Sequence, residues 1–306
     1  MGPAIWLQAG GADSRTEFSD PTTFDAGPTL NRDPNQIQVI DAVEIKPGLG
    51  LSEAYRFRYL MYWLAWRDIK VRYSQAYMGI FWALLQPLAT VAILSVVLGF
   101  LARVPSDGVP YSVFVVCGIV TWTIFSSALN NVSNGLRTNG ALLSKIYCSR
   151  LSVVLSTMGT PLFDSIFLFS SIVIIVLVQT HALSPLTLLA IPFLLWALVL
   201  GAGIGLLFSA LSIHYKDVPM VIPIILQIGM FASPVIYPPS LVPDRFLFLL
   251  HLNPVATIIS GVRWTIYGAP PPDMPALATS GAVSVAIVLW ALYYFNEVQR
   301  AYTDKM

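Results

Sequence analysis

The stretch LAWRDIKVRYSQAYMGIFWALLQPL, which runs from Leu64 to Leu88, decides the fold class of this chain. Its first part crowds four charged residues into six positions: Arg67, Asp68, Lys70 and Arg72. The next thirty residues carry no charge at all. Basic and aromatic side chains together are typical of a helix that lies in a membrane interface. The stretch therefore predicts an interfacial helix followed directly by a transmembrane helix.

The composition indicates an integral membrane protein. Of the 306 residues, 56% are hydrophobic and only 11% are charged, whereas a soluble domain has about 25% charged residues. Crossing a bilayer takes roughly 20 apolar residues. We expect an all-α integral membrane fold with six transmembrane helices, at Gly79–Leu101, Tyr111–Leu129, Val153–Val178, Pro185–Leu211, Val218–Tyr237 and Ala276–Val298.

The region between the fifth and sixth spans is rich in both proline and apolar residues. It contains two apolar pieces, Phe246–Leu252 and Val255–Tyr267, and each is too short to cross a bilayer. Irregular backbone at membrane depth is tolerated only where protein covers it or where it lines a cavity. These pieces therefore predict short re-entrant or interfacial helices.

The remaining sequence completes a division into four parts. They are a flexible cytoplasmic tail (1–46), an amphipathic interfacial helix (47–78), the six-span domain (79–298) and a short cytoplasmic tail (299–306). In the interfacial helix, Ser52 is the expected N-cap, and aromatic residues recur at helical spacing from Tyr55 to Tyr77. Asp68 and Arg72 are spaced as a favourable acid–base pair along that helix.

Lysine and arginine counts predict the orientation. With the N-terminus in the cytoplasm, fourteen of these residues fall in inside segments and three in outside segments. Cytoplasmic loops of membrane proteins carry this excess of positive charge. We therefore expect both termini in the cytoplasm. The first thirty residues lack the basic and apolar regions of a signal peptide, so the spans themselves are expected to direct insertion.

Several motifs resemble those of one family. WRDIKVRYSQAYMGIFWALLQPL (66–88), VPYSVFVVCGIVTWTIFSSAL (109–129) and NGALLSKIYCSR (139–150) are similar to the region before the first span, the second span and the following cytoplasmic loop of ABC-2 type exporters. HYKDV (214–218), SPVIYPPSLVP (233–243) and LNPVATIISGVRW (252–264) are similar to later parts of the same proteins. The resemblance is to the branch that exports polysaccharides such as O-antigen, capsule or teichoic acid chains.

The resemblance implies a membrane subunit of an ATP-driven exporter in a bacterial inner membrane. It implies a homodimer with two copies of a separate ATPase, and a lipid-linked polysaccharide, most consistent with O-antigen, as the cargo. Capsule, teichoic acid and small-molecule export are the alternatives. Two departures fall in the cytoplasmic loops: Cys148 and Ser149 stand where the family usually has Phe-Pro, and Lys216 where it often has Arg.

The residues independently favour a transport subunit over an ATPase or another enzyme. The chain has no G-x-x-x-x-G-K-[ST] motif, so it lacks a P-loop to cradle ATP phosphates. We expect no cofactor or metal on this chain, and ATP and Mg²⁺ on the partner.

Six spans are few for enclosing a polymer path, which favours a two-fold dimer. A membrane enzyme needs paired carboxylates or a metal site, yet the outer loops carry isolated carboxylates at Asp107, Asp244 and Asp273. Net charge of +1 suggests no nucleic-acid partner.

Basic and aromatic residues are the candidates for the substrate path. Basic side chains could bind a diphosphate, or they could only set topology and contact anionic lipid. Aromatic rings pack against the C–H faces of sugars, but they also form the interfacial belts of membrane proteins. The candidates are Arg67, Lys70, Arg72, Tyr62, Trp66, Tyr73, Trp82, Trp122, Phe125, Trp264 and Tyr267.

A second group of candidates would receive force from the ATPase. Residues Asn139 to Tyr147 can form a short cytoplasmic helix with Asn139 as its cap. The coupling candidates are Asn139, Leu142, Leu143, Lys145, Ile146, Arg150, Lys216 and Asp217.

Two features inside the spans carry weaker expectations. Asp164 lies within the third span, where a charge is costly. It either serves a proton or a substrate, or bonds Ser165 or a neighbouring helix. Gly201-x-x-x-Gly205 permits close helix packing, at a dimer interface or elsewhere.

Overall fold

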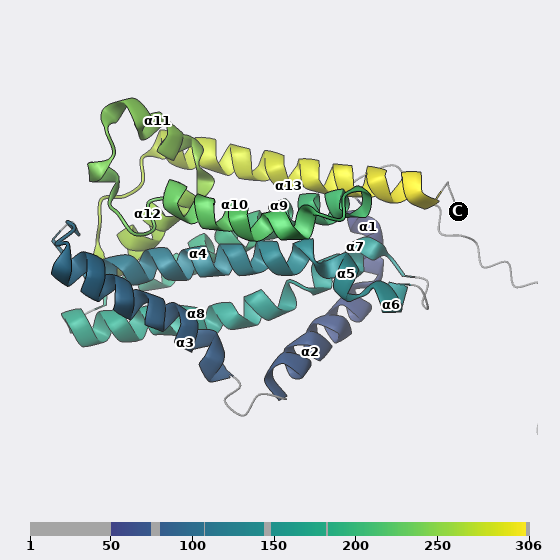
Figure 1. Ribbon diagram of the computed structural model, residues 1–306, viewed down its shortest axis with the longest axis horizontal. Helices are drawn as coiled ribbons and strands as arrows, with labels where there is room; N and C mark the ends of the chain where they lie inside the picture. Colours follow the sequence, from purple (N-terminus) through teal and green to yellow (C-terminus); the bar gives the residue numbers. More distant parts are fainter. Residues whose placement is uncertain (1–49, 75–79, 107, 144–147, 182, 304–306) are drawn as a thin grey trace, which may run out of the picture. The chain divides into compact units, whose positions relative to one another are not determined.

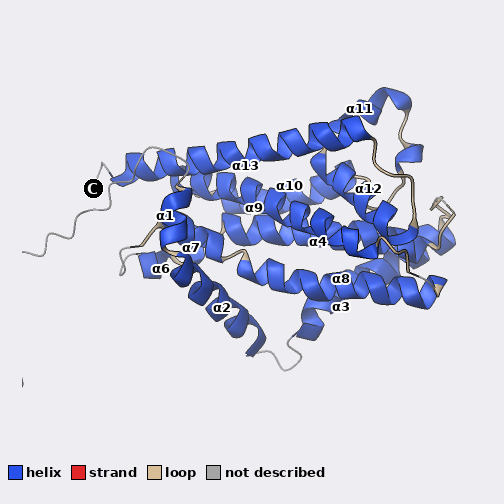
Figure 2. Ribbon diagram, turned by 180° about the vertical axis from the view of Figure 1, so that it is seen from behind, coloured by secondary structure: helices blue, strands red, loops and turns tan. Residues whose placement is uncertain are grey.

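The computed structural model describes residues 50–74, 80–106, 108–143, 148–181 and 183–303. All regular structure in these residues is helical (Figure 2), which confirms the all-α fold class. Contacts within the chain separate Met1–Glu44 from Ile45–Met306. The predicted N-terminal tail lies outside the described residues, and so does the junction at Gly79.

Five helical stretches in the described residues are long and apolar enough to cross a membrane, and they coincide with five predicted spans. In Figure 1 these stretches are α3 (Ile80–Leu94) with the π-helix η1 (Ser95–Leu101), α4 (Tyr111–Ser133), α7 (Arg150–Ser156) with α8 (Gly159–Thr180), the 3-10 turn η2 (Thr187–Leu189) with α9 (Ala190–His214), and α13 (Met274–Thr303).

The fifth predicted span is too long, because its helix stops early. Helix α10 covers Val218–Ala232, and 15 residues rise only about 22 Å, short of a hydrocarbon core of about 30 Å. The helix ends where Ser233 takes an extended conformation, with φ −105° and ψ 150°. Ser233 precedes Pro234, and a residue before proline is driven away from helical angles.

The predicted pair of short helices after α10 is confirmed. The 3-10 turn η3 (Pro239–Leu241) leads to α11 (Asp244–Leu252) and α12 (Pro254–Tyr267), which meet at an angle of 86°. At the bend, the Asn253 side chain accepts a hydrogen bond from the Val255 amide at 3.0 Å, and Pro254 takes the first helical position. By length and composition the pair is a broken span or a re-entrant loop.

The predicted interfacial helix is two helices rather than one. Helix α1 (Leu51–Arg56) begins after Gly50, which takes a left-handed conformation with φ 67°, so Ser52 is not the cap. The chain breaks at Phe57 and continues as α2 (Arg58–Ser74). The aromatic side chains of Tyr59 and Tyr62 are mostly exposed.

Helix α4 forms the centre of the packing and contacts α3, α8, α9 and α12. Two glycines allow α9 to approach it closely. A Cβ atom at Gly205 would lie 2.6 Å from the Leu129 carbonyl oxygen, and one at Gly201 would meet the Phe125 carbonyl oxygen still more closely. The small-residue motif therefore packs against α4 of the same chain rather than against a second copy.

Candidate functional site

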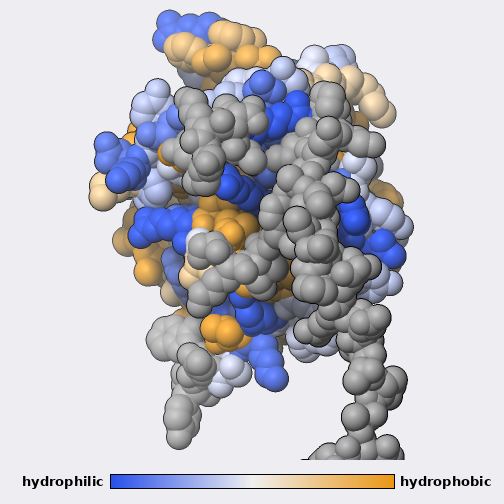
Figure 3. Space-filling model, turned by 90° about the vertical axis from the view of Figure 1, so that its right-hand side faces the viewer, coloured by the Kyte–Doolittle hydropathy of each residue, from blue (hydrophilic) through white to orange (hydrophobic). Residues whose placement is uncertain are grey.

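A cavity of about 1090 Å³ opens between the helices α2, α3, α4, α8 and α10. Its lining follows α4 from Ile119 to Asn131, toward the end of the helix that leads into α5 (Gly135–Thr138) and α6 (Gly140–Leu143). Figure 3 shows that hydrophilic residues gather on this end of the helices, among a few hydrophobic ones. We call the cavity of about 1090 Å³ the polar cavity.

The wall formed by α4 is a stripe of small polar side chains. Most of α4 is buried in apolar contacts, but its cavity face repeats polar residues at helical spacing: Thr123, Ser126, Ser127, Asn130 and Asn131. Gln86 and Thr90 of α3 add polar groups. This stripe was not predicted from the sequence, although its three- and four-residue spacing was available to find it.

Hydrogen bonds within α4 determine whether the polar stripe presents donors or acceptors to the cavity. The hydroxyl of Thr123 donates to the Ile119 carbonyl at 2.7 Å, and that of Ser126 donates to the Thr123 carbonyl at 3.2 Å. The Asn131 amide donates to the Ser127 carbonyl at 2.8 Å. Because these donors are occupied, the side-chain oxygens offer lone pairs to the cavity. The stripe suits a cargo rich in hydroxyl donors.

Asp164 is held at the cavity by two residues of α2. Its carboxylate lies 3.4 Å from the Arg72 guanidinium and accepts a hydrogen bond from the Tyr73 hydroxyl. Burial raises the pKa of the Tyr73 hydroxyl, and the hydrogen bond to Asp164 raises it further, so Tyr73 remains the donor. Of the two expectations for Asp164, bonding to a neighbouring helix matches this geometry, and the partner helix is α2. Arg72 thus pairs with Asp164, and the predicted Asp68–Arg72 pair is wrong.

Of the predicted aromatic path, Tyr73 and Trp122 reach the polar cavity. The Trp122 indole lies against Gly229 of α10 and packs on the Phe125 ring, with centroids 5.2 Å apart. Phe125 itself belongs to the buried core. Trp82 lies in α3, and its side chain is outside the described residues.

The other α2 candidates lie elsewhere. Tyr62 and Trp66 are exposed on the helix, and so is Lys70. Arg67 pairs with Asp68 at 2.7 Å and donates to the Asn139 side chain at 2.7 Å. Arg67 therefore contacts the loop between α5 and α6 rather than the cavity.

Trp264 and Tyr267 sit in α12 and do not line the polar cavity.

The coupling candidates cluster at helix ends near α5 and α6. The predicted helix from Asn139 is present as α6 as far as Leu143, while Lys145 and Ile146 lie outside the described residues. The Asn139 side chain does not cap α6; its amide donates to the Gly135 carbonyl at 3.2 Å and its oxygen accepts from Arg67. The others lie partly buried on α6, at the start of α7, or exposed just before α10: Leu142, Leu143, Arg150, Lys216 and Asp217.

Comparison with known proteins identifies the family. The family model described as ABC-2 type transporter matches residues 59–267, which include every helix that lines the polar cavity except the first residue of α2. The chain belongs to the ABC-2 type transporter family. This ABC-2 protein is therefore a multi-pass membrane protein of a transporter family, as the sequence motifs predict.

This ABC-2 protein matches three relatives over most of their length. It is 25% identical to the O-antigen export system permease protein RfbA of Myxococcus xanthus over 254 residues, which are 82% of this chain and 96% of the relative. It is 22% identical to the polysialic acid transport protein KpsM of Escherichia coli over 197 residues, 63% of this chain and 75% of the relative. It is 25% identical to the inner membrane transport permease YadH of Escherichia coli K12 over 256 residues, 78% of this chain and 96% of the relative.

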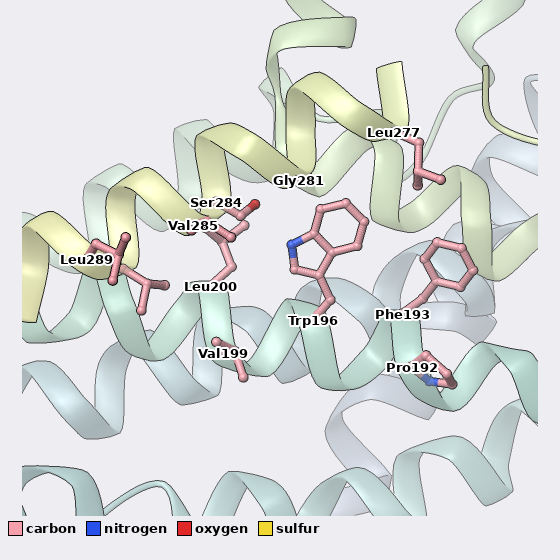
Figure 4. A pocket seen from close by; sticks show the side chains of 11 residues that line it. Pro192, Phe193, Trp196, Val199, Leu200, Leu277, Gly281, Ser284, Val285 and Leu289 are labelled. Atoms are coloured by element: carbon pink, nitrogen blue, oxygen red, sulfur yellow. The ribbon is translucent and has the colours of Figure 1, made fainter. Parts of the chain in front are cut away.

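A second hollow of the ABC-2 protein is a groove of about 540 Å³ between α9 and α13. Figure 4 shows Phe193 and Trp196 of α9 on one side and Val285 and Leu289 of α13 on the other, with Gly281 of α13 opposite Trp196. Its lining is almost wholly apolar. Such a wall matches lipid chains and offers little to a hydrated cargo, so it does not compete with the polar cavity as the candidate site.

Sequence analysis also missed a buried cation of the ABC-2 protein. Arg263 of α12 is 3% exposed and lies over the Phe114 ring, 3.7 Å from its centroid. It donates to the Val235 carbonyl at 3.0 Å, and the Tyr111 hydroxyl donates to the Ile236 carbonyl at 2.7 Å. These bonds fasten the connection after α10 to α4 and α12. An arginine inside a predicted membrane-embedded piece was the available signal.

Proposed function

We propose that this ABC-2 protein is the membrane-spanning subunit of an ATP-driven exporter that moves a lipid-linked polysaccharide out of the cytoplasm. The observation that carries the proposal is the polar cavity, where a stripe of serine, threonine and asparagine oxygens lies inside otherwise apolar spanning helices. Polar groups inside a membrane domain are costly, so they mark a path for a polar cargo.

The chemistry of the cavity suits a sugar chain. Sugar hydroxyls can donate to the side-chain oxygens of α4, while their C–H faces can pack on the Trp122 indole. Individually weak contacts of this kind let a polymer slide. Names of relatives add support, since one is an O-antigen export permease and another transports polysialic acid.

The energy source belongs to a partner in this proposal. Two copies of a separate ATPase bind ATP and Mg²⁺, and two copies of this chain form the membrane part. This chain binds no cofactor of its own. The proposal places α5, α6 and both termini in the cytoplasm of a bacterial cell and the spans in its inner membrane, in line with the excess of positive charge on the predicted inside segments.

O-antigen type chains are the cargo we favour, because the relative with that name is matched over 96% of its length. A capsule-type chain is the second candidate, favoured by the polysialic acid transport protein.

The test is deletion of the gene in its native host. We expect surface polysaccharide to disappear and lipid-linked polymer to accumulate inside the cell, with both defects reversed by the parent gene. Lipid-linked polymer is extracted and its sugars are identified by mass spectrometry, which separates O-antigen from capsule. Normal surface polysaccharide in the deletion strain would contradict the proposal.

A complementation variant focuses this test on the cavity. Ser127→Leu with Asn131→Leu would replace two acceptors of the stripe by apolar groups. We expect the variant to insert but to export poorly. The matched control is Ser170→Leu with Ile174→Phe, on an exposed face of α8, which should export normally.

A further inference from the structure

A recess of about 440 Å³ lies at the end of α4, between α5 and the connection from α9 to α10. Its walls include Ser133 and Asn134 from the end of α4, Arg137 from α5, Ser212 from the end of α9, and Lys216 from the connection to α10. Two cations from separate segments therefore face one recess. The chain brings them together only by folding, since 79 positions separate them in the sequence.

The charges of this recess are available to a ligand. In the described part of the chain, the two ion pairs are Arg67–Asp68 and Arg72–Asp164, so neither Arg137 nor Lys216 has a described carboxylate within pairing distance. Asp217 follows Lys216 but does not line the recess. An anion that approached Arg67 or Arg72 would have to displace a carboxylate, whereas the recess needs no such exchange.

The recess adjoins the polar cavity along two helices. On α4 the cavity is lined by Asn130 and Asn131 and the recess by Ser133 and Asn134, within one turn of helix. On α10 the cavity is lined by Pro223 and the recess by Pro219, again about one turn apart. A molecule held at the recess is thus within a turn of the polar stripe of α4.

We propose that Arg137 and Lys216 bind the diphosphate of the lipid-linked polysaccharide at this recess, next to the entrance of the polar cavity. The proposal rests on the proposed function and names the group of the cargo that is recognised. A guanidinium can hold two phosphate oxygens at once, and a lysine supplies a point charge. The hydroxyls of Ser133 and Ser212 donate to carbonyls of their own segments, so the two cations carry the recognition.

The direct test measures inorganic diphosphate binding to the full chain in nanodiscs of neutral phospholipid, by the rise in melting temperature with ligand concentration. We expect saturable binding to the parent and at least tenfold weaker binding to Arg137→Gln with Lys216→Gln. The matched control, Arg56→Gln with Arg58→Gln, removes the same charge from exposed positions on α1 and α2 and should bind like the parent. Parent-like binding by the recess variant, or equal loss in the control, would overturn the proposal.

A second arm separates a lipid source from a soluble one. Farnesyl diphosphate is added to the nanodisc bilayer, and inorganic diphosphate is titrated again. We expect its apparent dissociation constant for the parent to rise at least tenfold, because a membrane-anchored diphosphate reaches the same two cations. An unchanged constant would show a site for a soluble anion and would overturn the lipid-linked assignment.

A third arm addresses a protein occupant. If the recess instead received an acidic side chain of the ATPase, the double variant would keep diphosphate binding and lose co-purification with the ATPase, which would overturn the proposal. Failure of the proposed function has a different signature. In that case diphosphate binds and farnesyl diphosphate competes as expected, while the deletion strain keeps its surface polysaccharide.

Discussion

At the scale of single residues, Asp164 explains how α2 is fastened to the spanning helices. Its side chain is 7% exposed, while that of Arg72 is 45% exposed. A half-exposed ion pair contributes little by itself, but a buried carboxylate that loses its cation is strongly unfavourable. The Arg72–Asp164 pair therefore matters chiefly because loss of Arg72 would leave the buried Asp164 carboxylate without a cation.

This asymmetry predicts the order of stability in a mutant cycle. Arg72→Met should lower the free energy of unfolding by about 1–3 kcal/mol, because the Asp164 carboxylate is left beside an apolar side chain. Asp164→Asn added to Arg72→Met should restore part of the loss, since a neutral amide needs no cation and still accepts from Tyr73. The measurement is the melting temperature of the purified chain in detergent. Lys70→Met, on the exposed face of α2, serves as the control; a double variant no more stable than Arg72→Met would refute the argument.

Arg67 has a different partner from Arg72, although the two residues are only five positions apart on α2. It donates to Asn139, which lies 72 positions further along the chain, between α5 and α6. Asn139 is 3% exposed and also donates to the Gly135 carbonyl. Arg67 thus joins α2 to the loop that holds the predicted ATPase-coupling candidates.

Breaking this contact should uncouple hydrolysis from transport. For Asn139→Leu in the complex with its ATPase, we expect ATP hydrolysis to persist and export per ATP to fall several-fold, because α2 no longer follows the loop. Asn139→Asp keeps an acceptor for Arg67 and should retain most of the coupling. Export and hydrolysis are measured together in proteoliposomes. Equal coupling ratios in the leucine and aspartate variants would rule out this role.

At the scale of elements, α2 spans the distance between the loop and the polar cavity. Arg67 and Arg72 lie about 7.5 Å apart along its axis, with one bonded to Asn139 and the other to Asp164. A rigid helix with a contact at each site can pass a displacement from one to the other. The exposed aromatic side chains of α2, Tyr59 and Tyr62 among them, suit the predicted placement of this helix in the membrane interface.

The connection after α10 depends on one arginine from α12. Arg263→Met keeps the apolar stem but removes the donor to the Val235 carbonyl and the cation over Phe114. We expect a loss of about 1–3 kcal/mol, the cost of leaving a buried carbonyl without its donor. Melting temperature reports the loss.

Arg245→Met is the matched control for Arg263→Met. Arg245 is an exposed arginine on the neighbouring α11, where it lies over the Phe246 ring. Its replacement should change the melting temperature by less than half as much. Equal effects of the two substitutions would argue against a special role for Arg263.

At the scale of the whole molecule, the assembly is the main prediction. The purified chain of 33.5 kDa should run as a dimer in native mass spectrometry and should hydrolyse no ATP, because it has no P-loop. Addition of its ATPase should give a complex with two copies of each chain. Gly201→Leu should prevent the chain from folding and not only from forming a dimer, since Gly201 packs on α4 of the same chain. Robust hydrolysis by the chain alone, or a folded Gly201→Leu monomer, would contradict these expectations.

Much of the fold was accessible from the sequence, and less of the candidate site. Five spans and the two short helices before α13 were predicted in place, because an apolar run of sufficient length has few alternatives to a membrane helix. The early end of α10 was also available from Pro234, through its effect on Ser233. The polar stripe of α4 was visible in the spacing of Thr123, Ser127 and Asn130, although that spacing alone does not say which helices complete the wall.

What the sequence determined by itself is therefore the list of membrane helices, because hydropathy sums over neighbours in the chain. Only the tertiary structure decided which side chains meet. Tyr73 finds Asp164 across 91 positions, and Arg67 finds Asn139 across 72. Such partners depend on how α2 packs against α8 and the loop between α5 and α6, and packing depends on the shapes of all the helices together rather than on any local period. For the same reason, two arginines of one helix have different partners: Arg67 contacts the loop at Asn139, and Arg72 contacts Asp164 at the cavity.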